Sequence, residues 1–93
     1  MKDYDNAFVL FYASWCPFCR AFMPVFDEFT KRNPGKYKKV DVDEMPEESD
    51  KYSIEYYPTG ILFKKGKVAA RLDAEPGVGI TKEIFEKFCK KHF

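Results

Sequence analysis

Two cysteines three residues apart constrain this chain more than any other feature. They lie in the segment WCPFC (residues 15–19), directly after an apolar run at residues 7–13 and before a segment with helical spacing. Such a pair at the strand-to-helix junction of an α/β chain is a signature of thiol redox chemistry. If Cys16 caps the helix, Pro17 takes the first helical position, where its missing N–H costs nothing. Cys19 then falls one turn further on, beside Cys16, so the two sulfurs can bond with little backbone movement.

The start of the predicted helix also provides a local field for Cys16. Unpaired N–H groups and the positive end of the helix dipole face its sulfur and favour the thiolate. The thiolate is the reactive form in disulfide exchange. We therefore predict that Cys16 is the exposed nucleophile and that Cys19 is its resolving partner.

Length and composition favour a single domain over residues 1–93. Apolar residues make up 45% of the chain and aromatic residues 18%, which is enough for a core without metals or structural disulfides. Sixteen basic and fifteen acidic side chains leave a net charge of +1, which does not favour binding to nucleic acid or an anionic membrane. No apolar run is long enough to span a bilayer.

Cysteine usage and the first residues indicate the compartment. Three cysteines are an odd number, which argues against a secreted disulfide framework. Residues 1–6 are too acidic and too short for a signal peptide. We therefore expect a cytoplasmic protein, in which a Cys-X-X-Cys pair is catalytic or metal-binding rather than structural.

The pattern of apolar and turn residues predicts elements in the order β-α-β-α-β-β-α. A continuous apolar run indicates a buried first strand, amphipathic spacing indicates the first and last helices, and the Lys65-Gly66 turn indicates a hairpin. The expected strands are residues 7–13, 38–43, 60–64 and 67–72, and the expected helices are 17–32, 46–53 and 81–92. A right-handed βαβ unit followed by a hairpin gives a four-stranded mixed sheet with helices on both faces.

This order, with WCPFC after the first strand, resembles the thioredoxin superfamily in four blocks. The blocks are the helix with Pro24 five residues after Cys19, the strand at 39–43, the Tyr57-Pro58-Thr59 turn and the hairpin at 63–68. The resemblance covers roughly residues 7–91 and implies a minimal thioredoxin fold, an α/β domain with four strands and three helices.

The resemblance also implies a substrate-binding surface around the cysteines. Pro58 would be cis, and its backbone together with Tyr57 would hold an extended substrate segment beside the sulfurs. Trp15 would be a partly exposed lid over the sulfurs, and Phe18 would face solvent. The supporting residues would be Pro17 and Phe18, between the cysteines, and Lys39 on the second strand.

The implied activity is that of a thioredoxin-like protein-disulfide reductase. Cys16 would attack a substrate disulfide and Cys19 would resolve the mixed disulfide, leaving the protein oxidised. The redox group would be the Cys16–Cys19 disulfide itself, with no metal or organic cofactor. Partners would be protein disulfides and a thioredoxin-reductase-like enzyme or glutathione as reductant, and we expect a monomer. Reduction, oxidation and isomerisation all use this same chemistry.

Two departures from the family pattern concern the sheet and the proton acceptor. Residues 1–6 are too short for the extra strand and helix with which thioredoxins open, so the second strand becomes an edge. The family's buried aspartate six residues before the first cysteine is Leu10 here. Lys39 matches the lysine that partners that aspartate. Water, Lys39 or a loop acid such as Asp73 are therefore the candidates for accepting the proton of Cys19.

A third departure from the family pattern suggests an alternative enzymatic activity. The Pro17-Phe18 pair resembles glutaredoxins rather than the Gly-Pro of thioredoxins. The glycine pair followed by aspartate that glutaredoxins carry after their fourth strand is not evident in residues 73–79. Glutathione-dependent, glutaredoxin-like turnover is therefore the alternative.

The alternative outside enzymes is a zinc-binding or interaction module. Cys16 and Cys19 form half of a possible site, and Cys89 and His92 supply a second pair at ligand-like spacing. The expected fold argues against this site, since Cys89 would lie about 13 Å along the last helix from its start at Ile80, at ~1.5 Å per residue. We expect Cys89 to be a buried inert thiol and His92 to be a solvated helix-end charge.

Overall fold

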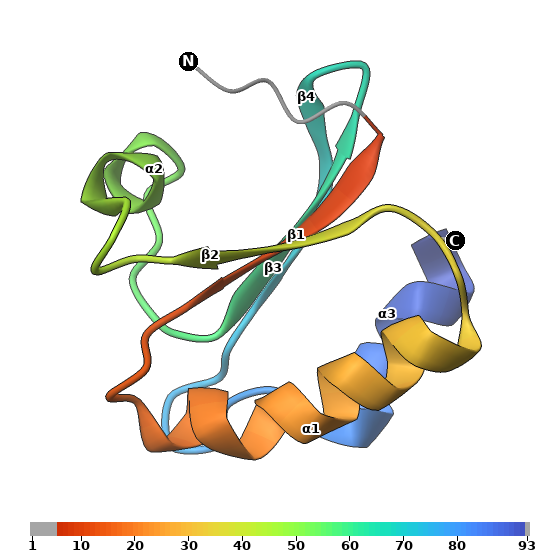
Figure 1. Ribbon diagram of the computed structural model, residues 1–93, viewed down its shortest axis with the longest axis horizontal. Helices are drawn as coiled ribbons and strands as arrows, with labels where there is room; N and C mark the ends of the chain where they lie inside the picture. The colour runs from red at the N-terminus through yellow and green to blue at the C-terminus, as the bar shows by residue number, and fades with distance from the viewer. Residues whose placement is uncertain (1–5, 93) are drawn as a thin grey trace.

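The computed structural model describes residues 6–92 and contains the expected order of strands and helices. Figure 1 shows their arrangement around one sheet. The elements are β1 (Ala7–Tyr12), α1 (Pro17–Arg32), β2 (Tyr37–Asp41), α2 (Pro46–Lys51), β3 (Thr59–Lys64), β4 (Lys67–Asp73) and α3 (Lys82–His92). The predicted β-α-β-α-β-β-α order is confirmed, and the bounds differ from the expected ones by two residues or fewer at each end.

The sheet is mixed and has the strand order β2-β1-β3-β4. The pairing of β1 with β2 is parallel, whereas β1 with β3 and β3 with β4 are antiparallel. The parallel pair is joined through α1, and the antiparallel hairpin needs only a short turn. Among the strands of residues 6–92, the second strand has the expected edge position, and exposed Lys38 and Lys39 lie on it. Lysines of this kind discourage pairing with another chain.

Helices cover both faces of the sheet. In Figure 1, α1 and α3 lie on one face and α2 lies on the other. One buried cluster, on the α1 and α3 face, is rich in phenyl rings, among them Phe22, Phe26 and Phe85. A second cluster contains Val9, Phe11 and the two cysteines of the motif. The central strand β1 therefore supplies both clusters, in alternation, as a strand buried on two faces must.

Close packing between two central strands sets the position of the aromatic cluster. Phe8 is fully buried, and a methyl group added at Gly60 would overlap its ring. Gly60 pairs with Leu10 across β1 and β3, so the missing side chain makes room for Phe8 at the centre of the sheet. The ring of Phe8 packs against Phe26 and Phe85, with centroids 6.0 and 5.8 Å apart. This packing holds α1 and α3 against β1.

The three helices begin as the sequence indicates. Cys16 and Met45 precede prolines at the first helical positions of α1 and α2. Thr81 precedes α3, and its Oγ1 accepts a hydrogen bond from the N–H of Ile84 at 3.2 Å. α1 continues through Pro24 to Arg32. Within residues 6–92 no helix combines the length and apolar character needed to cross a membrane.

Candidate active site

Cys16 occupies the N-cap of α1, at the end of the sheet where β1 finishes. Its backbone is extended, with φ −87° and ψ 122°, and Pro17 follows at the first helical position. The Cys16 N–H donates to the Ala13 carbonyl at 3.1 Å, and the Cys16 carbonyl accepts from the Arg20 N–H at 3.1 Å. The short turn after β1 and the first turn of the helix thus fix this residue from both sides. This position places the sulfur at the positive end of the α1 dipole.

The Cys16 thiol points at the loop that precedes β3. Its Sγ donates to the backbone carbonyl of Tyr57 at 3.5 Å. The residue is 8% exposed, so the expectation of an exposed nucleophile is wrong for this structure. The reason is the direction of the side chain, which turns toward the Tyr57 carbonyl rather than toward solvent. Cys16 nevertheless keeps more exposed surface than Cys19, which is 2% exposed.

Cys19 lies one helical turn further on, beneath Cys16. Its Sγ accepts a hydrogen bond from the Ala13 N–H at 3.4 Å. Burial raises the pKa of the Cys19 thiol to about 12, and the Ala13 N–H opposes this in part. The neighbouring Cys16 raises that pKa further, through a hydrogen bond and through its charge. The two sulfurs therefore interact, as the spacing predicts, and Cys19 is held protonated at neutral pH.

The loop before β3 brings backbone polar groups to the cysteines. The Tyr57–Pro58 peptide bond is cis, the form that the resemblance implies, and Pro58 is buried. Thr59 Oγ1 donates to the Tyr56 carbonyl at 2.6 Å. Tyr57 is fixed at its other end, because its hydroxyl lies 2.5 Å from the Ser49 hydroxyl on α2. The Tyr57 ring is thus an anchor, and its carbonyl is the group that faces the Cys16 thiol.

Trp15 lies beside the cysteines with 62% of its surface exposed. Its Nε1 donates to Asp43 Oδ1 at 3.3 Å, and its ring meets Tyr57 edge-on with centroids 6.3 Å apart. The indole is therefore oriented by two contacts but leaves most of its surface open to solvent. An aromatic surface held in this way can contact a partner with little loss of side-chain entropy.

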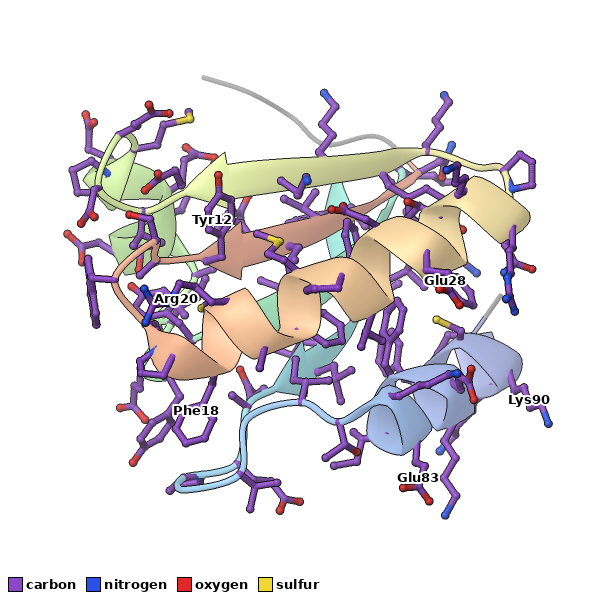
Figure 2. All side chains as sticks on the ribbon, turned by 60° about the horizontal axis from the view of Figure 1, so that its bottom comes forward. Tyr12, Phe18, Arg20, Glu28, Glu83 and Lys90 are labelled. Atoms are coloured by element: carbon purple, nitrogen blue, oxygen red, sulfur yellow. The ribbon has the colours of Figure 1, made fainter. Side chains whose placement is uncertain are left out.

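Phe18 packs against the loop between Glu75 and Gly79, which lies far from it in the sequence. It projects from the first turn of α1 (Figure 2). The side chain is 39% exposed. A Cβ built at Gly79, whose φ is +78°, would lie 2.9 Å from the Phe18 Cβ. The loop is closed by backbone hydrogen bonds in both directions between Glu75 and Gly79, at 2.9 and 3.1 Å. Pro76 and the glycines indicated a loop, but no local signal indicated its contact with Phe18.

Exposed apolar side chains gather around this end of the molecule. Among the described residues, five large apolar side chains are exposed, and four of them belong to segments that form the site. Trp15 and Phe18 adjoin the cysteines, Tyr56 precedes the cis peptide bond and Val78 lies in the loop that contacts Phe18. Such a concentration is typical of an interaction surface.

Lys39 and Asp73, the two candidate side chains for accepting the proton of Cys19, are each held in an ion pair. Leu10 is fully buried and pairs with Lys39 across β1 and β2, so the register places this lysine beside Leu10. The Lys39 ammonium forms an ion pair of 3.0 Å with Asp27 on α1. Asp73 forms an ion pair of 2.8 Å with Arg71 on its own strand. Of the three candidates, water is the one not already held in an ion pair.

The structure does not assemble the alternative zinc site. Within residues 6–92, no group of three or more His, Cys, Asp and Glu side chains is placed to hold a metal ion. Cys89 is buried in the aromatic cluster, and burial raises the pKa of its thiol to about 12. His92 was expected to be solvated, but it is half-buried with its ring centroid 4.6 Å from that of Phe88. Cys89 and His92 thus pack against the aromatic side chains around α3 and do not lie with the cysteines of α1.

Comparison with known proteins gives one family. The family model described as Thioredoxin matches residues 1–90. A thioredoxin H-type from Oryza sativa subsp. indica is 41% identical over 83 residues, covering 88% of this chain and 64% of the relative. Thioredoxin H4 from Arabidopsis thaliana is 36% identical over 94 residues, covering 98% of this chain and 75% of the relative.

Solved structures agree with the sequence comparisons. The reduced thioredoxin pre-protein of Schistosoma mansoni superimposes with a TM-score of 0.81 at 31% identity, covering 98% of this chain and 82% of that one. Plasmodium falciparum thioredoxin superimposes with a TM-score of 0.83 at 27% identity, covering 98% and 86%. The chain thus spans most of these folds but just under two thirds of the rice relative's length.

Proposed function

The chain belongs to the thioredoxin family, and from this we propose that it is a thiol–disulfide oxidoreductase that acts on protein disulfides. The observation that carries the proposal is the placement of Cys16 at the N-cap of α1, above Cys19 and facing the Tyr57 carbonyl. This arrangement supplies a nucleophile in the field of a helix N-terminus, a second sulfur within reach and a backbone segment that can hold a substrate.

In the first step, the Cys16 thiolate attacks one sulfur of a substrate disulfide. A bond forms between the Cys16 sulfur and that sulfur, the substrate S–S bond breaks, and the second substrate sulfur leaves as a thiolate that takes up a proton. The substrate is then held by a mixed disulfide. The positive end of the α1 dipole favours the attacking thiolate, whereas the resting thiol donates a hydrogen bond to the Tyr57 carbonyl at 3.5 Å.

In the second step, Cys19 attacks the Cys16 sulfur and releases the substrate. The Cys19 thiol must first lose its proton, and burial opposes this by raising its pKa to about 12. Cys16 itself contributes to that raised pKa, through its charge and its hydrogen bond. A Cys16 sulfur bound in a mixed disulfide carries no charge, so that contribution falls away at the moment when Cys19 must ionise. The Ala13 N–H then stabilises the Cys19 thiolate, and water takes the proton.

Both steps together transfer two electrons from the protein to the substrate. The substrate disulfide becomes two thiols, and Cys16 and Cys19 end as a disulfide. A thioredoxin-reductase-like enzyme or glutathione then restores the dithiol, and no metal or organic cofactor is required. We place the protein in the cytoplasm, because its three cysteines are an odd number, which does not suit a secreted disulfide framework. We propose that it acts as a monomer.

The substrate is an extended protein segment that lies along residues 57–58. Main-chain groups of such a segment can add to the backbone of Tyr57, as in other cases of strand addition. Because the Tyr57 carbonyl is 3.5 Å from the Cys16 sulfur, a cysteine in the added segment would lie close to the nucleophile. The exposed faces of Trp15 and Phe18 would contact its apolar side chains.

The proposal is tested by measuring reduction of insulin disulfides with two recycling systems in parallel. NADPH with thioredoxin reductase should support turnover, and the metal content of the active protein should be negligible. Turnover of hydroxyethyl disulfide with glutathione alone would instead identify the glutaredoxin-like activity that Pro17-Phe18 resembles. Stoichiometric zinc whose removal by a chelator unfolds the chain would contradict both redox readings.

A further inference from the structure

A concave site lies at the end of the molecule opposite the cysteines. It is a cavity of about 830 Å³ between the C-terminal half of α1, α3 and the neighbouring ends of β1 and β3. In Figure 2, Phe18 marks the cysteine end of α1, whereas Glu28 on α1 and Lys90 on α3 mark the cavity end. The volume is typical of cavities that hold small molecules, roughly 300–1,000 Å³. The redox mechanism does not use any part of it.

The interior of this cavity is apolar and largely aromatic. Val25, Phe29 and Tyr37 line it and are only half-buried, so each presents an open face to the cavity. Phe85 and Cys89 line it and are buried. The Phe29 ring meets Phe85 edge-on at 4.9 Å and Tyr37 edge-on at 6.3 Å between centroids. An aliphatic chain can replace water on such a surface with a gain for each methylene group buried.

The rim of the cavity is basic, although the chain as a whole is nearly neutral. Five basic and two acidic side chains line it, a formal excess of three positive charges, whereas the whole chain carries +1. The basic side chains are Arg32, Lys36, Lys64, Lys82 and Lys90, and the acidic ones are Glu28 and Glu86. Arg32 and Glu28 form an exposed ion pair of 3.2 Å. The remaining excess is therefore carried by lysines.

Two of these lysines are held on either side of one strand. Phe8 at the start of β1 pairs with Tyr37 on one side and with Leu62 on the other. Lys36 directly precedes Tyr37, and Lys64 follows Leu62 by two residues on the same face of β3. Both lysines are exposed and line the cavity. They thus offer two ammonium groups at the mouth of an apolar space.

We propose that this cavity binds a small amphipathic anion, with its apolar chain against Phe29 and Tyr37 and its carboxylate at the rim formed by Lys36 and Lys64. A saturated fatty acid of medium chain length has this chemistry. Apolar walls favour the chain, and the lysines favour a negative over a neutral head group. Because the cavity shares no lining residue with the cysteine site, binding is independent of the proposed redox function.

The test is titration of ¹⁵N-labelled protein, oxidised at Cys16–Cys19, with decanoate below its critical micelle concentration. Amide resonances of Gly35, Leu62 and Cys89 should shift, and those of Trp15 and Cys16 should not. Affinity should rise from hexanoate to octanoate to decanoate, by up to about fourfold per added methylene. Decanol, with the same chain and no charge, should bind more weakly.

Two double variants distinguish the effect of the rim lysines from a general effect of net charge. Lys36→Gln with Lys64→Gln should weaken decanoate binding on the order of fivefold. Lys67→Gln with Lys87→Gln removes the same charge from exposed positions outside the cavity and should leave the affinity unchanged. All four positions are exposed, so both double variants should fold like the wild type.

Five results would overturn the proposal. Four concern the ligand: the absence of saturable shifts with decanoate, shifts centred on the cysteine end, equal binding of decanol and decanoate, and equal loss in the two double variants. The fifth is a change of the same resonances on dilution of the protein alone, which would show that a second copy of the chain covers the cavity.

Discussion

The cysteine end of the sheet and the aromatic core beneath α1 and α3 each hold a deeply buried thiol, yet the two thiols have different surroundings. Cys19 is 2% exposed and Cys89 is 4% exposed, and burial raises the pKa of each to about 12. Cys19, however, accepts the Ala13 N–H at 3.4 Å and lies beside Cys16. Cys89 lies among phenyl rings, and the charge of Glu86 disfavours its thiolate further.

Under the proposed function, neither burial nor a raised pKa is enough to distinguish the resolving thiol, because Cys19 and Cys89 share both. What distinguishes Cys19 is a backbone donor that stabilises its thiolate and a neighbouring sulfur that it can attack. Both come from the geometry of one turn, because Ala13 ends the segment after β1 and Cys16 caps α1. The aromatic core offers Cys89 no such donor among the contacts described above, and α3 carries no second cysteine.

The largest expected effect comes from replacing the three thiols one at a time by serine. Cys16→Ser should abolish insulin reduction, because no other thiol lies at a helix N-terminus. Cys19→Ser should lose turnover but accumulate mixed disulfides with substrates, because the first step survives without a resolving sulfur. Non-reducing gels with mass spectrometry measure the trapped species.

Cys89→Ser is the control for this series. It should keep wild-type insulin reduction and lose only stability, since a polar hydroxyl replaces a thiol in an apolar cluster. Equal trapping by the Cys16 and Cys19 variants, or loss of activity in folded Cys89→Ser, would refute the distinction between the two regions.

The second effect is the pH dependence of thiol modification. Thiols are alkylated as thiolates, and the pKa values of Cys19 and Cys89 are about 12 in the folded chain against an ordinary value of 9.0. At pH 8, ionisation alone should slow their reaction with iodoacetamide by about a thousandfold relative to the denatured chain. Quantitative mass spectrometry of each cysteine-containing peptide gives the three rates.

The raised pKa values of the two buried thiols should also make the stability of the fold depend on pH. A raised pKa means that the protonated thiol favours the folded state, so this stabilisation is complete below pH 9 and is lost as the pH rises toward 12. Cys89→Ala should therefore lose stability less steeply than the wild type over that range, as followed by urea unfolding. Alkylation of Cys89 as fast in the folded as in the denatured chain at pH 8 would contradict its burial.

A smaller effect is expected when polarity is introduced where the two regions meet. Leu10 is fully buried in the aromatic cluster at the position of the family's proton acceptor. Leu10→Asp should destabilise the fold by about 3 kcal/mol, from lost packing and burial of a carboxyl group. Desolvation should raise the pKa of that carboxyl, so the variant should become less stable as the pH rises from 4 to 8.

The matched control is Leu10→Asn, which has a similar shape and no charge. It should lose comparable stability without the pH dependence, as measured by urea unfolding at several pH values. If the new carboxyl accepts the proton of Cys19, release of substrate should quicken in Leu10→Asp but not in Leu10→Asn. A Leu10→Asp variant as stable as the wild type at pH 8 would mean that the position is not buried.

The sequence by itself determined the order of strands and helices and the spacing of Cys16 and Cys19. Apolar periodicity and local signals such as Pro17, Pro46 and Thr81 act within a few residues, so they can be read without the fold. The same local logic placed Cys19 one turn after Cys16, and the structure has them in contact. Among the described strands, β2 lies at an edge of the sheet, as the comparison with the family pattern predicted.

Only the tertiary structure decided how these positions are surrounded. The direction of the Cys16 thiol depends on Tyr57, 41 residues away, and the support of Phe18 depends on Gly79 in a distant loop. The engagement of Lys39 by Asp27 and the basic rim of the cavity likewise join separate elements. Contacts of this kind arise when strands and helices pack, and no local pattern encodes which side chains then meet.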